Sequence, residues 1–188
     1  MKYDMILSGV GGQGTLLAAK ILASLAVQSG LDVKLSEIHG MAQRGGSVIT
    51  HVRMGKNVHA PVISIGSADF VLAFEWLEAL RATPYLKEDG VLIASNQKIM
   101  PITVITGSGD YPSYDNNALL IDALELAKKA GNARCANTVM LGALSCYLPF
   151  SEEAWAKSFK ECIKPQFLEV NTRAYELGRQ YMKETQNI

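Results

Sequence analysis

The sequence predicts an α/β fold, a three-layer α/β/α sandwich on a mostly parallel but mixed sheet. Three observations predict it. Apolar runs of strand character alternate with helical stretches over the N-terminal part of the chain. A glycine-rich turn at residues 9–14 joins the first strand to the first helix. From residue 116 onward the pattern is nearly all helical, and Pro149 and Pro165 separate the helices. With 188 residues, we expect a single domain, residues 1–188.

Each element follows from its local pattern. Short apolar runs bounded by turn residues predict strands at 3–9, 32–38, 68–74, 90–95 and 102–106. Longer stretches predict helices at 14–29, 75–86, 116–130, 136–148, 151–163 and 166–185.

An inserted β-hairpin is expected between the second and third of these strands. Residues 47–54 and 57–64 are both β-rich, and Gly55 and Lys56 join them. A hairpin inside a chain of βα units makes the sheet mixed. His51 and His59 would face each other across it, as a satisfied pair rather than a metal site, because no third Cys or Asp ligand is evident nearby.

The turn at residues 9–14 has the G-x-G-x-x-G form of a Rossmann-like nucleotide-binding fold. Such glycines let the backbone approach a ligand, and the following helix offers free N–H groups to an anion. Glu37, near the end of the second predicted strand, could bind a ribose. The alternative is a tight turn that serves packing only. The candidate phosphate- or coenzyme-A-facing residues are Gly9, Gly11, Gly12, Gln13 and Gly14.

A second glycine-rich segment follows at residues 36–47. An ordinary dinucleotide fold would pass directly into a helix here. Glycines with a few polar side chains are typical of a surface loop that meets a ligand or a partner, and an ordinary solvated loop is the alternative. The candidate interface or cofactor-proximal residues are His39, Gln43, Arg44 and Ser47, of which Arg44 is best suited to a phosphate or carboxylate.

Composition excludes several classes of protein. Lys plus Arg and Asp plus Glu both total 18, so no basic excess indicates nucleic acid. No apolar run reaches the roughly 18 residues of a membrane span, and no secretory h-region opens the chain. We therefore expect a cytoplasmic protein that is neither membrane-bound nor nucleic-acid-binding.

No self-sufficient active site is evident. Cys135, Cys146 and Cys162 are spaced by 11 and 16 residues, unlike metal or cluster motifs, and are expected to be core thiols. The chain has no Walker lysine and no G-x-S-x-G elbow. We assign no catalytic residue and no metal ligand to it.

The two glycine segments together resemble the gamma-type subunits of the 2-oxoacid:ferredoxin oxidoreductases, and are most similar to the beta subunits of the indolepyruvate branch. The form of residues 37–48, with His-Gly-Met-Ala-Gln-Arg-Gly-Gly, indicates that branch. The likeness runs in order along nearly the whole chain. Further matching segments are 68–75, 85–90, 137–144 and 171–178.

The resemblance implies a non-catalytic subunit of an enzyme that oxidatively decarboxylates a 2-oxoacid to an acyl-coenzyme A. Thiamine diphosphate, Mg²⁺ and 4Fe–4S clusters would lie on a larger alpha subunit, coenzyme A would be the co-substrate, and ferredoxin would accept the electrons. A heterotetramer is the arrangement that the resemblance suggests. The alternative function is a free-standing dinucleotide-binding protein or oxidoreductase that uses the turn at 9–14.

Overall fold

The structure is a computed structural model that describes residues 2–40, 45–113 and 117–187. Within these residues, one sheet has the strand order β2-β3-β1-β4-β5-β6. β1, β4, β5 and β6 pair in parallel, whereas β3 runs antiparallel to both β1 and β2. The predicted mixed sheet is confirmed, with β3 as the reversed strand. The strands are β1 (Lys2–Val10), β2 (Asp32–His39), β3 (Ser47–Gly55), β4 (Ala68–Ala73), β5 (Leu86–Ser95) and β6 (Leu119–Ile121).

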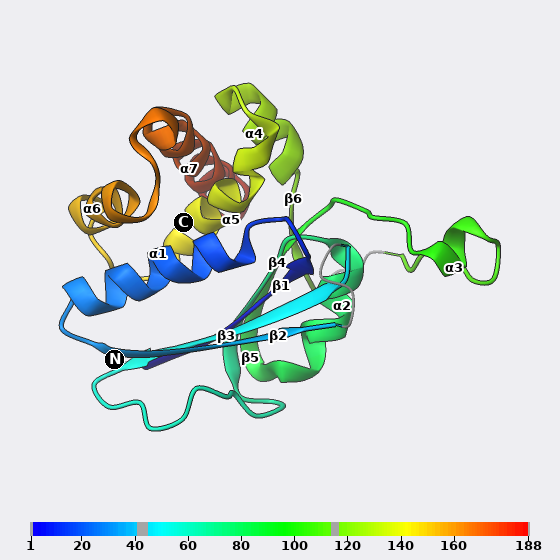
Figure 1. The fold of residues 1–188 in the computed structure, drawn as a ribbon, viewed down its shortest axis with the longest axis horizontal. Helices are drawn as coiled ribbons and strands as arrows, with labels where there is room; N and C mark the ends of the chain where they lie inside the picture. Colours follow the sequence, from blue (N-terminus) through cyan, green and yellow to red (C-terminus); the bar gives the residue numbers. More distant parts are fainter. Residues whose placement is uncertain (1, 41–44, 114–116, 188) are drawn as a thin grey trace.

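Helices cover both faces of the sheet (Figure 1). One face carries α1 (Thr15–Gln28), α4 (Ala123–Ala130), α5 (Ala136–Ser145), α6 (Glu152–Cys162) and α7 (Pro165–Gln186); the other carries α2 (Trp76–Ala82). The short α3 (Ile102–Ile105) lies on an excursion that projects away from the body (Figure 1). Two 3₁₀ turns complete the set, η1 (Thr83–Tyr85) and η2 (Ala133–Cys135). None of the helices described is long and apolar enough to cross a membrane.

Two hydrophobic cores, one on each face, explain the three layers. Side chains alternate along β1, so Met5 and Leu7 join the core under α1, while Ile6 joins the core under α2. All three side chains are fully buried. The predicted three-layer α/β/α class is confirmed.

The predicted hairpin at 47–54 and 57–64 is wrong. The first run is β3, but β3 has β1 on one side and β2 on the other, so no edge remains for a second arm. Residues 57–64 instead form an irregular loop over the face that carries α2. Arg53 holds this loop by donating hydrogen bonds to the carbonyls of Ala60 (3.1 Å) and Val62 (3.0 Å).

Three further elements differ from prediction around β5. The β-branched run predicted as a strand at 102–106 forms the one-turn helix α3, because β6 already pairs with β5 at that side of the sheet. The helix predicted over 116–130 begins only at Ala123, after β6, and the Asp122 side chain caps it by accepting from the Glu125 N–H at 3.3 Å. The helix predicted over 75–86 is shorter, since α2 passes into η1 and β5 begins at Leu86.

Candidate functional site

The first glycine turn lies where β1, β4 and β5 end together. Gly12 and Gly14 adopt positive φ angles of 103° and 84°, and Gly14 is the N-cap residue of α1. A side chain at Gly9 would be crowded, because its Cβ would lie 2.9 Å from Gln13 Oε1 and 3.3 Å from Phe74 Cβ. At Gly12 the Cβ position is open, with no atom of the described residues within 4 Å. The turn therefore combines a packed base with an accessible tip.

Gln13 braces the turn from inside. Its Oε1 accepts a hydrogen bond from the Val10 N–H at 2.7 Å, at the end of β1. Its Nε2 donates to the Phe74 carbonyl at 2.9 Å, just after β4, and to Gln97 Oε1 at 3.1 Å, just after β5. The amide thus joins three strand ends, so it positions the turn rather than reaching outward from it.

Asn137 holds the turn from the opposite side. This residue is 4% exposed near the start of α5, and its Nδ2 donates to the Gly14 carbonyl at 3.2 Å. A Cβ at Gly14 would lie 2.4 Å from the same nitrogen. Sequence reasoning missed this role, because the contact spans 123 residues. The N-terminus of α1 is consequently fixed in place with its first N–H groups directed at the turn.

Two cavities adjoin the turn and share Gly12, Gln13, Arg134 and Asn137. One measures about 260 Å³ and lies toward Ser95 and Gln97. The other measures about 430 Å³ and is lined in addition by Lys164 and by Phe167, which is 43% exposed. Among the described residues, neither lining contains Asp or Glu. This environment is suited to an anion, because it combines a helix N-terminus, an open glycine and two cationic side chains with no carboxylate in the lining.

The second glycine segment contacts the first. The Gly11 N–H donates to the Gly46 carbonyl at 2.9 Å, and the Gly40 N–H donates to the Ser47 carbonyl at 2.9 Å.

Of the four predicted interface residues, Gln43 and Arg44 lie outside the described residues. His39 is exposed and its Nε2 lies 2.8 Å from Glu37 Oε1. Ser47 donates a hydrogen bond to the carboxylate of Glu78.

Two buried carboxylates support this region, and sequence reasoning did not identify them. Glu75 and Glu78, at the start of α2, are 1% and 2% exposed. Glu75 caps α2 through the Glu78 N–H (2.9 Å) and also accepts from the Ile99 N–H (2.9 Å) and the Tyr111 hydroxyl. Glu78 accepts from Ser47 and from Arg81 at 2.5 Å. Glu75 and Glu78 therefore fasten the second loop and the excursion after β5 to the same helix.

Glu37 does not occupy the ribose-binding place of a dinucleotide fold. In a dinucleotide fold, the strand that carries the ribose-binding acidic residue lies directly beside β1. Here β3 lies between β2, which carries Glu37, and β1. Two strand spacings amount to roughly 10 Å. Glu37 instead accepts from Thr50 Oγ1 at 3.0 Å and contacts His39. The geometry does not support the dinucleotide interpretation.

The histidines and cysteines form no site in the part of the chain that the structure describes, where no group of three or more His, Cys, Asp or Glu could hold a metal ion. His51 is buried, and its Nδ1 accepts from the Ile63 N–H at 3.1 Å, whereas His59 is exposed. Burial raises the pKa of the thiols of Cys135, Cys146 and Cys162, all of which are unpaired.

Comparison with known proteins assigns the family. Residues 4–181 match the family model described as pyruvate ferredoxin/flavodoxin oxidoreductase. The chain belongs to this family. It is 39% identical, over 97% of both chains, to the indolepyruvate oxidoreductase subunit IorB of Thermococcus kodakarensis. It is 37% identical to the subunit of the same name from Archaeoglobus fulgidus, covering 95% of this chain and 94% of that one.

Solved structures of the family share the fold. The gamma subunit of a keto/oxoacid ferredoxin oxidoreductase from Geobacter sulfurreducens is 26% identical, with a TM-score of 0.75 over 97% of this chain and 99% of that one. The PORC subunit of pyruvate oxidoreductase from Thermotoga maritima has a TM-score of 0.71 at 22% identity, over 95% of this chain and 96% of that one. As a member of the family, the chain is a small subunit of an oxidoreductase complex of the 2-oxoacid:ferredoxin kind.

Proposed function

We propose that the chain is the non-catalytic subunit of a thiamine-diphosphate-dependent oxidoreductase that converts an aryl 2-oxoacid, with indolepyruvate as the first candidate, to an acyl-coenzyme A. The observation that carries the proposal is the likeness over full length to subunits named for indolepyruvate. Relatives named for ketoisovalerate and pyruvate are less similar, at 26–29% identity.

The proposal places thiamine diphosphate, Mg²⁺ and the 4Fe–4S clusters on a larger alpha subunit, and electrons leave the complex to ferredoxin in the cytoplasm. The cysteines of this chain support that division. They lie in η2, at the end of α5 and in α6, and burial raises the pKa of their thiols, which disfavours the thiolate form that binds iron. Bound thiamine supplies carbanion stabilisation, and the protein chains supply binding and shielding.

The turn at 9–14 is proposed to bind the phosphate groups of coenzyme A. The N–H groups at the start of α1 would donate to a phosphate, and the open position at Gly12 lets it approach the backbone. Arg134 and Lys164 add positive charge. Phe167 offers an exposed ring to a base. Gln13 would position the turn without touching the ligand.

The second loop is proposed to contact the alpha subunit through His39, Gln43, Arg44 and Ser47. It adjoins the first turn through the Gly11–Gly46 hydrogen bond. A ligand on the turn and a partner on the loop would therefore meet at one place. This is the arrangement that a subunit needs if it helps to enclose a cofactor held by its partner.

Recovery from the native host tests the proposal. The tagged chain, purified without crosslinking, is expected to bring down one larger protein together with iron, acid-labile sulfide and thiamine diphosphate. Recovery of the chain alone, or with a partner that holds neither iron nor thiamine, would contradict the subunit assignment.

A kinetic experiment on the recovered complex tests the coenzyme A site. Arg134→Gln and Lys164→Gln are each expected to raise the KM for coenzyme A by about tenfold, since charge-assisted hydrogen bonds are lost. Lys157→Gln, an exposed α6 lysine outside both cavities, is the matched control. Unchanged KM values in both cavity variants would exclude binding of coenzyme A at this turn. Tight binding of a nicotinamide or flavin dinucleotide by the isolated chain would instead favour the dinucleotide-binding alternative.

A further inference from the structure

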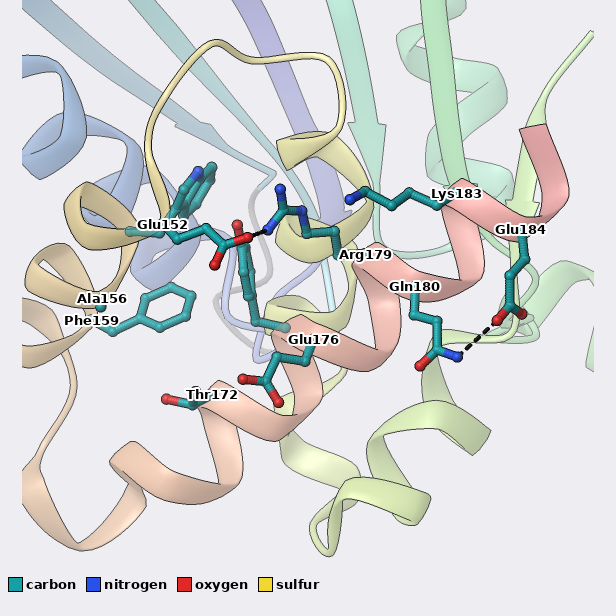
Figure 2. Close-up of a pocket in the computed structure, with 11 residues that line it drawn as sticks. Glu152, Ala156, Phe159, Thr172, Glu176, Arg179, Gln180, Lys183 and Glu184 are labelled. Atoms are coloured by element: carbon teal, nitrogen blue, oxygen red, sulfur yellow. Dashed lines mark hydrogen bonds and ion pairs between the residues drawn. The ribbon is translucent and has the colours of Figure 1, made fainter. Parts of the chain in front are cut away.

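A separate groove lies between α6 and α7, away from the glycine turn. It has a volume of about 400 Å³, within the range of small-molecule sites. Figure 2 shows the two helices diverging around it. None of its lining residues lines the cavities beside the turn. Its lining includes Trp155, Phe159, Tyr175, Glu176, Arg179 and Lys183.

The deep wall of the groove is aromatic. Trp155 and Phe159 are each 2% exposed, and Tyr175 is 6% exposed. The Tyr175 ring centroid lies 5.2 Å from each of the other two, tilted against Trp155 and edge-on to Phe159. These contacts fix the orientation of the rings. A flat apolar group could pack against them without first ordering the wall.

Two residues that line the groove each carry a buried hydrogen-bond donor with no acceptor among the described residues. They are Trp155 Nε1 and Arg179 Nε, and only four side-chain atoms among the described residues are buried without a partner. A buried donor without an acceptor is unfavourable and calls for an explanation. Both atoms are donors with almost no accessible surface, so an acceptor could satisfy them only by displacing the side chains around them.

The mouth of the groove carries charges of both signs. Arg179 and Lys183 are cationic, and Figure 2 shows both side chains on the same stretch of α7. Carboxylates line the same mouth, at Glu152, Glu176 and Glu184. Glu152 already pairs with Arg179, but its side chain is 73% exposed and can move away. A simple anion or a simple cation would meet groups of its own sign, whereas a zwitterion matches both sets.

We propose that this groove binds a free aromatic α-amino acid. The ring packs against Phe159 and Tyr175, the carboxylate accepts from Arg179 and Lys183, and the ammonium group donates to Glu176. An aryl 2-oxoacid is one transamination away from such an amino acid. The assignment does not depend on the substrate proposed above, because it concerns different residues and is tested without turnover.

Calorimetric titration of the full chain tests the site with matched ligands. Phenylalanine and tryptophan are expected to bind. Phenylpropionate lacks the ammonium group, phenethylamine lacks the carboxylate and alanine lacks the ring, and each is expected to bind at least about tenfold more weakly. Equal binding of phenylpropionate and phenylalanine would overturn the zwitterion assignment, and so would a failure of both amino acids to bind.

Variants on α7 locate the binding. Arg179→Gln and Glu176→Gln are each expected to weaken the binding of phenylalanine by about tenfold. Arg173→Gln and Glu169→Gln change exposed residues of the same helix outside the groove and are expected to bind as the unaltered chain does. Circular dichroism and melting temperature establish that each variant is folded. Unchanged affinity in both groove variants would overturn the proposal, as would loss of phenylalanine binding in the complex recovered from the host.

Discussion

The main-chain N–H of Gly11 donates a 2.9 Å hydrogen bond to the carbonyl of Gly46, and this bond joins the two glycine-rich segments of the chain. Neither residue has a side chain, so the two backbones can approach closely. The joined segments form the edge at which we place both a phosphate-bearing co-substrate and a partner subunit.

Gly14→Ala is expected to destabilise the chain by about 2–4 kcal/mol, because it combines a positive φ of 84° with a Cβ only 2.4 Å from Asn137 Nδ2. Gly30→Ala is the control, since Gly30 also has a positive φ, 70°, but open space around it. That variant is expected to lose about 1–2 kcal/mol. Urea unfolding measures both. Equal losses would show that the contact with Asn137 does not constrain the turn.

Gln13→Glu is expected to lower the free energy of unfolding by about 1–3 kcal/mol, because a carboxylate oxygen would replace the amide nitrogen that donates to the Phe74 carbonyl. Gln166→Glu, at an exposed position of α7, is expected to change stability by less than about 0.5 kcal/mol. If Gln13 contacted the ligand instead of bracing the turn, Gln13→Glu would keep its stability and lose only affinity for coenzyme A.

Acid is expected to destabilise the fold through His51. Burial, reinforced by the charge of Arg53, lowers the pKa of His51 below its usual 6.5. The unfolded chain then binds a proton more readily than the folded chain does. The contribution of His51 to the free energy of unfolding is fully present above about pH 6.5. Below that pH it decreases, by at most about 1.4 kcal/mol per pH unit.

His51→Asn tests this pH dependence, because an amide can still accept from the Ile63 N–H but does not titrate. The fall in melting temperature between pH 7.5 and 5.5 is expected to be smaller in this variant than in the unaltered chain. His59→Asn, at an exposed histidine, is expected to leave that fall unchanged. An identical fall in all three proteins would exclude His51 as its source.

Arg44→Ala is expected to weaken binding of the alpha subunit by roughly 30-fold, the effect of removing an anchor worth about 2 kcal/mol. Arg44→Lys is expected to bind the alpha subunit almost as weakly as Arg44→Ala does, because lysine lacks the planar fork of donors. Arg173→Ala, at an exposed residue of α7, serves as the control. Titration calorimetry with the purified alpha subunit measures all three. Wild-type affinity and wild-type turnover in both Arg44 variants would exclude the boundary role.

The sequence predicted what is local and missed what is long-range. The strand, turn and helix over β1 and α1 follow from adjacent residues, and the structure has them. The hairpin at 47–64 failed because strand pairing depends on which edges are free, and β3 lies between β1 and β2. Likewise, the glycines of the turn were identified, but Asn137, Arg134 and Lys164 were not, since they reach the turn from more than 100 residues away. The four predicted interface residues remain predictions.

Reconstitution tests the central claim most directly, namely that the chain is required for an oxidoreductase without being active alone. Reduction of an oxidised viologen is followed with indolepyruvate and coenzyme A for the chain alone, the purified alpha subunit alone and the two combined. The combined proteins are expected to give rapid reduction that depends on both substrates, and each alone is expected to give almost none. Rapid reduction by the chain alone, or full activity of the alpha subunit without it, would contradict this account.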